Sequence, residues 1–332
     1  MRTGWFLCML VPAVAVGQQN SVDIPRDTSF TIHSAAASIQ SKYPFARIVT
    51  PDPPPGITVA KNIVYTSYGK RELRLDLFRP EESKKGPFPA VIMIHGGGWQ
   101  SGDRSLQVPL AQHLATAGYV AAVVEYRRSP EAHYPAAVHD VKAAIRWMRA
   151  HCGEYAIDST RIAVSGCSAG GQLAALVGTT NGDPRFEDGG DNAGHLSNVQ
   201  AIVDVDGILD FTDPAESGKD TIPGKPSAGA AWFGATYKER PELWVEASPL
   251  VHVSKTTPPI VFINSSLRRF HAGRDEMIGK LKTLNIYHEI HTVPNTPHPF
   301  WLFHPWFEPT CEYITAFLDR TLRGSSQNSR TK

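Results

Sequence analysis

The chain has 332 residues, of which 42% are hydrophobic and 20% are charged, and this is the profile of a globular protein with a sizeable core. Lys and Arg number 33 against 32 Asp and Glu, so the formal net charge is +1. This near-neutral balance does not indicate a surface that binds nucleic acid or another polyanion.

The first 17 residues have the three-part layout of a secretory signal peptide. Arg2 supplies a positive charge, an apolar run covers residues 5–16, and small residues precede a cleavage point after Gly17. No later stretch has the roughly 18 consecutive apolar residues that a membrane helix needs. We therefore expect a secreted or periplasmic protein with no membrane insertion after cleavage. The alternative is a buried N-terminal strand.

Three regions follow the signal peptide. Residues 18–56 are expected to form an irregular, proline-rich leader that lies over the domain or hangs free, because its final proline run forbids both helix and central strand. Residues 57–323 form one domain, and residues 324–332 form a polar tail.

Apolar strands and helix-length segments alternate through the domain. The expected strands lie at 62–68, 72–80, 89–97, 119–127, 161–166, 199–207, 258–266 and 286–293. The expected helices lie at 105–117, 135–152, 168–180, 272–285 and 306–322, with only short helices between 208 and 248. This alternation predicts an α/β fold with a mostly parallel eight-stranded sheet, helices on both faces, and the first two strands as an antiparallel edge.

Ser168 stands between a predicted strand and a predicted helix, in the stretch Gly166-Cys167-Ser168-Ala169-Gly170. Ligands bind beyond the carboxyl ends of the strands in such a sheet. Flanking glycines permit the sharp turn that exposes a serine hydroxyl at a helix N-terminus, so this G-x-S-x-G pattern predicts a nucleophile. The alternative is a structural turn.

A second pattern, His95-Gly-Gly-Gly-Trp99, closes another central strand. Consecutive glycines let backbone N–H groups approach a ligand closely. Together with the serine turn, this loop predicts an oxyanion hole in which Gly97 or Gly98 supplies one amide and Ala169 the other. Taken alone, the loop is equally compatible with a flexible connection.

A serine hydroxyl needs a neutral imidazole to take its proton. Among 13 histidines, His298 has the expected position, in the loop after the last strand, and His304 is its rival near the start of the closing helix.

The third member of a triad should be an acid after the strand 258–266. Asp275 is the first acid there and is our first choice, followed by Glu276, and by Asp210 after the preceding strand. A solvated acid in the first turn of a helix is the alternative interpretation of Asp275.

These motifs together resemble the α/β-hydrolase superfamily, in particular the esterase and lipase branch with bacterial feruloyl- and acetylxylan-esterase-like enzymes. The resemblance runs from about Asn62 to Leu322 and includes VIMIHGGGW, DSTRIAVSGCSAGGQLAAL, ASPLVHV and PPIVFIN. It implies a serine carboxylesterase without metal or organic cofactor. The segment SSLRRFHAGRDEM departs from the short glycine-to-aspartate turn of most relatives, although with TPHPFWLF it is similar to an exported pectin-esterase-like subgroup.

We therefore expect an enzyme that removes methyl, acetyl or feruloyl esters from plant cell-wall polysaccharide such as pectin or xylan. Arg268 and Arg269 beyond a strand end suit the carboxylates of uronic acids, and Trp99 suits stacking on a sugar ring. The alternative interpretations are ion pairs for the two arginines and burial in the core for Trp99. An exported peptidase of the same fold and a non-catalytic binding protein are the alternative functions.

Three cysteines remain after the predicted cleavage, so they cannot all be paired. Cys167 is expected to be a small buried hydrophobe, and pairing of Cys152 with Cys311 is left open, as is the oligomeric state. No cysteine and histidine spacing matches a zinc site.

Overall fold

The computed structural model describes residues 26–81, 86–220 and 224–324. The predicted signal peptide, residues 18–25 of the leader and the tail after Gly324 lie outside these residues.

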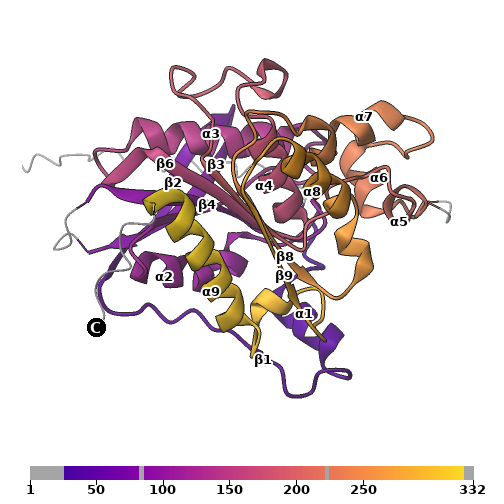
Figure 1. The fold of residues 1–332 in the computed structure, drawn as a ribbon, viewed down its shortest axis with the longest axis horizontal. Helices are drawn as coiled ribbons and strands as arrows, with labels where there is room; N and C mark the ends of the chain where they lie inside the picture. The colour runs from indigo at the N-terminus through magenta and orange to yellow at the C-terminus, as the bar shows by residue number, and fades with distance from the viewer. Residues whose placement is uncertain (1–25, 82–85, 221–223, 325–332) are drawn as a thin grey trace, which may run out of the picture.

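One eight-stranded sheet runs through the described part of the chain (Figure 1). Its order is β2-β3-β5-β4-β6-β7-β8-β9, in which β2 pairs with β3 and β3 pairs with β5 antiparallel, while the remaining neighbours are parallel. The strands are β2 (Ile57–Tyr68), β3 (Arg71–Pro80), β4 (Phe88–Ile94), β5 (Val120–Val124), β6 (Ile157–Cys167), β7 (Ala201–Val205), β8 (Ile260–Ser265) and β9 (His288–Val293). The predicted fold class, strand number and antiparallel edge are confirmed.

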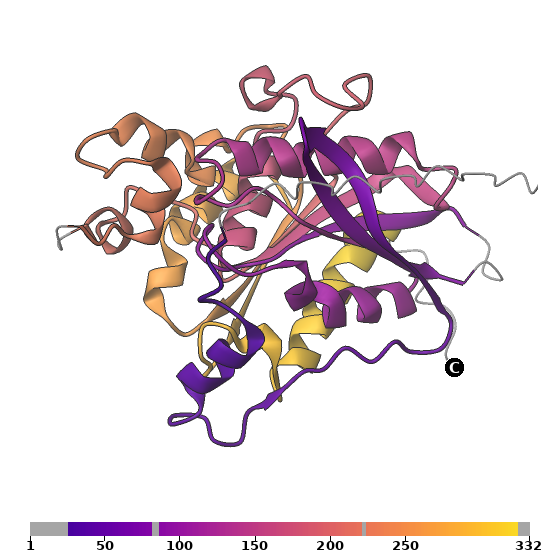
Figure 2. The same cartoon turned by 180° about the vertical axis from the view of Figure 1, so that it is seen from behind.

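Helices cover both faces of the sheet (Figures 1 and 2). One face carries α2 (Val108–Thr116) and α9 (Phe307–Leu318), and the other carries α3 (Ala136–Ala150), α4 (Ala169–Thr179) and α8 (Arg274–Thr283). Along β4, side chains alternate between the two faces because successive residues of a strand point to opposite sides. Val91 and Met93 therefore pack with α2 and α9, whereas Ile92 and Ile94 pack with α3 and α4.

Short elements make up the connections. Between β7 and β8, the helices of the described residues 206–220 and 224–259 are short, as expected: α5 (Pro214–Ser217), α6 (Ala228–Phe233) and α7 (Pro241–Glu246). The single turns are η1 (Arg104–Gln107), η2 (Pro184–Phe186), η3 (Pro249–His252), η4 (Arg268–His271), η5 (Phe300–Leu302) and the π-helical η6 (Asp319–Arg323).

The leader is more ordered than its sequence suggests. It contains α1 (Ile32–Ile39), whose first turn is closed by a capping box between Thr31 and Ser34, and β1 (Arg47–Ile48), which pairs with β10 (Phe303–His304). The expectation of an irregular segment is therefore wrong for these residues, because tertiary contacts with the last part of the chain stabilise elements too short to recognise from periodicity. The leader lies over the domain, and its described residues outside α1 and β1, including the proline run, form neither helix nor strand.

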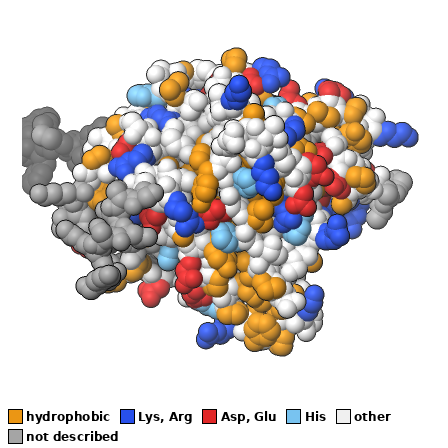
Figure 3. Space-filling model, in the orientation of Figure 1, with side chains coloured by type: hydrophobic (Ala, Val, Ile, Leu, Met, Phe, Trp, Pro, Cys, Tyr) orange, Lys and Arg blue, Asp and Glu red, His pale blue; other side chains and the backbone are white. Residues whose placement is uncertain are grey.

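The surface has no single dominant charge on the face shown in Figure 3, where acidic and basic side chains are interspersed. Hydrophobic side chains gather at its lower edge, where Figure 1 places α1 and β1. In the described ranges, no helix combines the length and apolar character needed to cross a bilayer.

Cys152, Cys167 and Cys311 are free thiols. Cys152 packs with the core on the α3 side of the sheet, whereas Cys311 lies in the core on the α9 side. The sheet thus separates the two cysteines whose pairing was left open. Cys167 is buried, as expected.

The connections of β4 and β6 open a crevice between these neighbouring strands. The chain leaves β4 through α2 on one face and leaves β6 through α4 on the other. In open α/β sheets, ligands bind where neighbouring connections diverge in this way, beyond the carboxyl ends of the strands. The triple-glycine loop follows β4 and Ser168 follows β6, so the two predicted motifs meet at this point.

Candidate active site

Ser168 sits at a sharp turn between β6 and α4. Its backbone has φ 57° and ψ −121°, in the region that L-residues rarely adopt, and it is the N-cap of α4. A Cβ atom on Gly166 would lie 1.9 Å from the carbonyl oxygen of Gly170, and one on Gly170 would lie 2.2 Å from that of Ile94. The turn therefore requires glycine on both sides, and it presents the serine at the positive end of a helix.

His298 connects the serine to a carboxylate. Its Nε2 lies 2.8 Å from Ser168 Oγ, and its Nδ1 lies 2.8 Å from Asp206 Oδ2. A carboxylate only accepts hydrogen bonds, so Nδ1 carries the imidazole proton and Nε2 accepts the hydrogen bond donated by the serine hydroxyl. The structure thus brings together Ser168 and His298, as the sequence predicts, and adds an acid that the sequence analysis did not select.

Asp206 directly follows β7 and is fully buried. Its Oδ1 accepts a hydrogen bond of 2.8 Å from the backbone N–H of Ser265 on β8, and its own backbone has φ 54°. Both carboxylate oxygens are therefore engaged, which fixes the orientation of the carboxylate toward His298.

A second acid, Asp204, lies two residues before Asp206 and is also fully buried. Burial raises the pKa of Asp204 well above the usual range of a carboxyl group, against the hydrogen bond that its Oδ1 accepts from Gly207. Its Oδ2 has no hydrogen-bond partner in the described part of the chain.

Asp275 does not reach His298, so the prediction that it is the third triad member is wrong. It lies in the first turn of α8, its side chain is 74% exposed, and its carboxylate pairs with Arg274. Glu276 is exposed in the same turn. Asp210 accepts hydrogen bonds from Thr212 and belongs to the loop before α5. Asp275 and Glu276 do not reach His298 because α8 begins shortly after η4 and turns its first acids toward solvent.

One signal for Asp206 was present in the sequence. The stretch "AIVDVDG" places two aspartates inside an apolar strand, and the second precedes a glycine at the carboxyl end. Asp206 falls within the predicted strand 199–207, whereas the acid is expected after the next strand, 258–266.

Aromatic rings enclose the imidazole. Phe270 of η4 stacks face to face on His298 with ring centroids 3.5 Å apart, and Trp301 of η5 meets it edge-on at 5.2 Å. Phe270 belongs to the segment in which the acid was sought. That segment contributes a ring that restrains the imidazole, while the carboxylate comes from the neighbouring strand.

The residues predicted to form an oxyanion hole line the same cavity as Ser168. This cavity has a volume of about 390 Å³ and includes Gly97, Gly98 and Ala169 in its wall. Gly97 has φ 125° and a Cβ there would lie 2.1 Å from the Ser101 carbonyl oxygen. Ala169 is the first residue of α4, and the first N–H groups of a helix have no acceptor within it. The arrangement can hold an anion beside the serine.

The three predicted substrate-binding residues differ in position. Trp99 lines the cavity but is nearly buried, with its Nε1–H donating to Gln172 Oε1 over 3.0 Å. Arg269 also lines the cavity, yet its guanidinium is already paired with Glu216 at 2.6 Å. Arg268 is exposed and is absent from the cavity wall as described.

The leader contributes to this cavity, and no pattern in its sequence indicates this. Asp27, Ser29 and Phe30 line it together with Ser168 and His298.

The rival histidine, His304, lies in β10 and pairs with Glu308 at 2.6 Å. In the described ranges, no group of three or more His, Cys, Asp and Glu side chains is arranged to hold a metal ion.

Comparison with known proteins places these features in context. Residues 75–278 match the family model BD-FAE. The chain is 33% identical over 247 residues to the probable carboxylic ester hydrolase LipM of Mycobacterium tuberculosis, an alignment that covers 72% of this chain and 56% of LipM. The chain thus spans little more than half the length of this relative.

Two solved structures are similar in fold and at a modest level in sequence. A truncated carbohydrate esterase from gut microbiota has a TM-score of 0.68 and 26% identity, covering 82% of this chain and 99% of that one. The propionate-bound thermophilic esterase Est2 of Thermogutta terrifontis has a TM-score of 0.63 and 25% identity, covering 80% and 94%.

Proposed function

The chain belongs to the BD-FAE family, in the esterase branch of the α/β-hydrolase superfamily, and from this premise we propose that it is a serine carboxylic-ester hydrolase. The observation that carries the proposal is the continuous hydrogen-bonded chain from Ser168 through His298 to Asp206, with 2.8 Å at each step. Each group is within the reach required for proton transfer or orientation.

The first stage of the proposed reaction forms an acyl-enzyme. Ser168 Oγ attacks the ester carbonyl carbon while His298 Nε2 takes the hydroxyl proton. Asp206 stabilises the imidazolium that results. The negative charge on the carbonyl oxygen is held by the amides of Gly97 or Gly98 and of Ala169, each worth about 3 kcal/mol in such sites. His298 then gives the proton to the leaving alcohol, and the carbon–oxygen bond of the ester breaks.

The second stage regenerates the serine. A water molecule gives a proton to His298 Nε2 and attacks the acyl carbon, and the resulting oxyanion uses the same amides. His298 returns the proton to Ser168 Oγ as the carboxylic acid leaves. Ester bonds are cleaved in this scheme without a metal or an organic cofactor.

Replacement of the nucleophile tests the proposal. Ser168→Ala should retain its fold and lose p-nitrophenyl acetate hydrolysis and labelling by a fluorophosphonate probe. Ser254→Ala, at an exposed serine, is the matched control and should keep both. Wild-type turnover by Ser168→Ala would refute the mechanism. Faster cleavage of an aminoacyl p-nitroanilide than of the ester would favour a peptidase instead.

We further infer that the ester is linked to a carbohydrate, with methyl, acetyl or feruloyl groups on pectin or xylan as the substrates to test. Support comes from the carbohydrate esterase among the structural neighbours and from a cavity wall that combines aromatic, charged and small polar side chains. The pairing of Arg269 with Glu216 compensates the charge expected to attract uronates, which favours neutral polymers such as xylan. Release of acetate, methanol or ferulate from a panel of polysaccharides distinguishes these groups.

Export is proposed from the sequence of residues 1–17. The N-terminal residue of the protein recovered outside the cytoplasm should be Gln18, and deletion of residues 1–17 should keep the enzyme inside the cell. Recovery of uncleaved protein beginning at Met1 in the cytoplasm would contradict export.

A further inference from the structure

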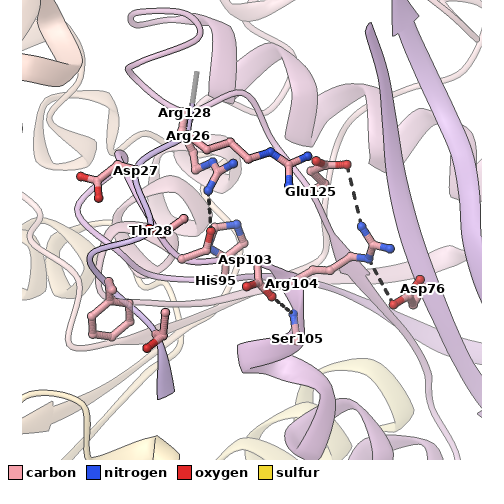
Figure 4. A pocket seen from close by; sticks show the side chains of 13 residues that line it. Arg26, Asp27, Thr28, Asp76, His95, Asp103, Arg104, Ser105, Glu125 and Arg128 are labelled. Atoms are coloured by element: carbon pink, nitrogen blue, oxygen red, sulfur yellow. Dashed lines mark hydrogen bonds and ion pairs between the residues drawn. The ribbon is translucent and has the colours of Figure 1, made fainter. Parts of the chain in front are cut away.

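A second cavity adjoins the catalytic one. It has a volume of about 370 Å³, within the range of ligand-binding sites, and Figure 4 shows the side chains that line it. Asp27 and Phe30 of the leader line both cavities. Between them, Thr28 lines only the second cavity and Ser29 only the catalytic one, as expected when an extended segment turns successive side chains to opposite sides. One extended segment of the leader, residues 27–30, therefore separates the two cavities.

The wall of the second cavity carries charges of both signs. Three arginines and four carboxylates line it, and they are Arg26, Arg104, Arg128, Asp27, Asp76, Asp103 and Glu125. The guanidinium of Arg104 lies between Asp76, at 3.1 Å, and Glu125, at 3.8 Å (Figure 4). Arg128, which is almost fully buried, donates to the Gly102 carbonyl oxygen over 2.8 Å.

These charges nearly cancel. With four carboxylates against three guanidinium groups, the wall offers no strong net attraction to an anion or to a cation. A neutral polyhydroxylated ligand suits such a wall, because each hydroxyl group donates to a carboxylate and accepts from a guanidinium N–H.

Two uncharged rings, those of His95 and Phe30, also line this cavity. His95 is buried, which lowers the pKa of its imidazole to about 4, so the ring is uncharged near neutral pH. Its Nδ1 lies 2.8 Å from the Gly96 carbonyl oxygen, which only accepts, so Nδ1 carries the proton and Nε2 is an acceptor. Phe30 adds an aromatic ring at the border with the catalytic cavity. Hydrogen-bonding groups of both kinds beside one aromatic ring suit a sugar unit, which has polar edges and apolar C–H faces.

We propose that the second cavity is a glycosyl subsite, which binds a neutral sugar unit of the substrate next to the unit whose ester is cleaved at Ser168. This inference rests on the proposed esterase function and names its substrate class: an esterified oligosaccharide or polysaccharide of uncharged sugars, at least two units long. An ester on a single sugar ring occupies the catalytic cavity alone and gains nothing from the subsite.

Chain length is therefore the first measurement. The ratio of kcat/KM for O-acetylated xylotriose to kcat/KM for an O-acetylated methyl xyloside should be at least about tenfold in the full-length enzyme after signal cleavage. Acetylated trigalacturonate, which carries carboxylates, should show no such gain. Equal rates for the triose and the monosaccharide, or a larger gain for the uronate, would overturn the subsite.

Two variants locate the effect. Thr28→Trp fills the cavity from the leader, and Asp103→Asn changes the acceptors while keeping a side chain that caps η1 equally well. Each should reduce the chain-length ratio by at least about fivefold, whereas Glu242→Gln, an exposed carboxylate paired with Arg240 on α7, should leave the ratio and the basal rate unchanged. If Thr28→Trp does not fold, Asp103→Asn decides the result, and an unaltered ratio in the folded variants would refute the assignment.

Binding without turnover separates this proposal from the proposed function. Ser168→Ala should bind unesterified xylotriose in calorimetry, and Ser168→Ala combined with Thr28→Trp should not. A wild-type enzyme that cleaves no ester contradicts the esterase mechanism, while sugar binding sensitive to Thr28→Trp still supports the cavity. Ester cleavage with no sugar binding contradicts the subsite alone.

Discussion

Replacement of Asp206 by asparagine changes one carboxylate oxygen of the Ser168-His298-Asp206 triad into an amide nitrogen. Oδ1 of Asp206 accepts the Ser265 N–H, and the asparagine carbonyl oxygen can keep that bond. The amide NH2 group then faces His298 Nδ1, where the carboxylate oxygen lies 2.8 Å away in the wild type. Because NH2 only donates, the imidazole must turn Nδ1 into an acceptor and carry its proton on Nε2. Nε2 can then no longer take the serine proton.

The size of the effect follows from this change of tautomer. In a Ser-His-Asp triad, the wrong tautomer lowers kcat by about 10⁴-fold, equivalent to about 5.4 kcal/mol of transition-state stabilisation. Stability should change little, since the bond to Ser265 remains. Asp206→Ala instead leaves the buried N–H of Ser265 without an acceptor. Besides the loss of activity, this variant should therefore have a free energy of unfolding that is lower by about 1–3 kcal/mol.

Steady-state hydrolysis of p-nitrophenyl acetate measures the effect, with thermal unfolding to confirm that each variant is folded. Asp275→Asn is the matched control, and its kcat should stay within about twofold of the wild type because that carboxylate is exposed and contacts Arg274. Near-normal turnover in folded Asp206→Asn, or a loss of several orders of magnitude in Asp275→Asn, would show that the geometric assignment of the acid is mistaken.

Two further predictions concern groups around the relay. Phe270→Leu removes the ring stacked on His298. We expect kcat to fall about tenfold with little change in KM, because the imidazole is less well oriented while the substrate contacts remain. A rise in KM alone would contradict this role. Asp204→Asn tests the raised pKa of that buried carboxyl group. A raised folded-state pKa gives stability that is present below the unfolded value and lost as pH rises, so the non-ionisable variant should gain free energy of unfolding relative to the wild type between pH 4 and pH 8, by at most about 1.4 kcal/mol per pH unit. Urea denaturation at the two pH values measures the difference, and a constant difference would contradict a buried acid with a raised pKa.

Local patterns in the sequence were sufficient for the fold. Continuous apolar runs such as those of β4 and β5 indicate strands buried on both faces, and helix-length segments between them require parallel connections. The same patterns located Ser168, since only glycine permits the approach of backbone that its turn requires, and His298, since it follows the last strand of the sheet.

Contacts between distant segments determined which acid completes the triad. The relay joins Ser168, Asp206 and His298, which come from three different connections, and the choice among acids depends on which carboxylate the sheet edge turns toward the imidazole. Asp206 is 92 residues from His298, and its register at the end of β7 is set by pairing with β8.

The order of the leader and the second cavity were likewise visible only in the tertiary structure. Strand β1 forms because β10 offers its edge, and Asp27 lies between two cavities because that pairing and the burial of α1 hold the leader against the domain. The sequence by itself determined the strands of the large sheet, the long helices that flank it and the nucleophile, because these depend on neighbouring residues and their periodicity. The identity of the acid and the walls of the site depend on distances between residues far apart in the chain, and those distances exist only once the sheet has assembled.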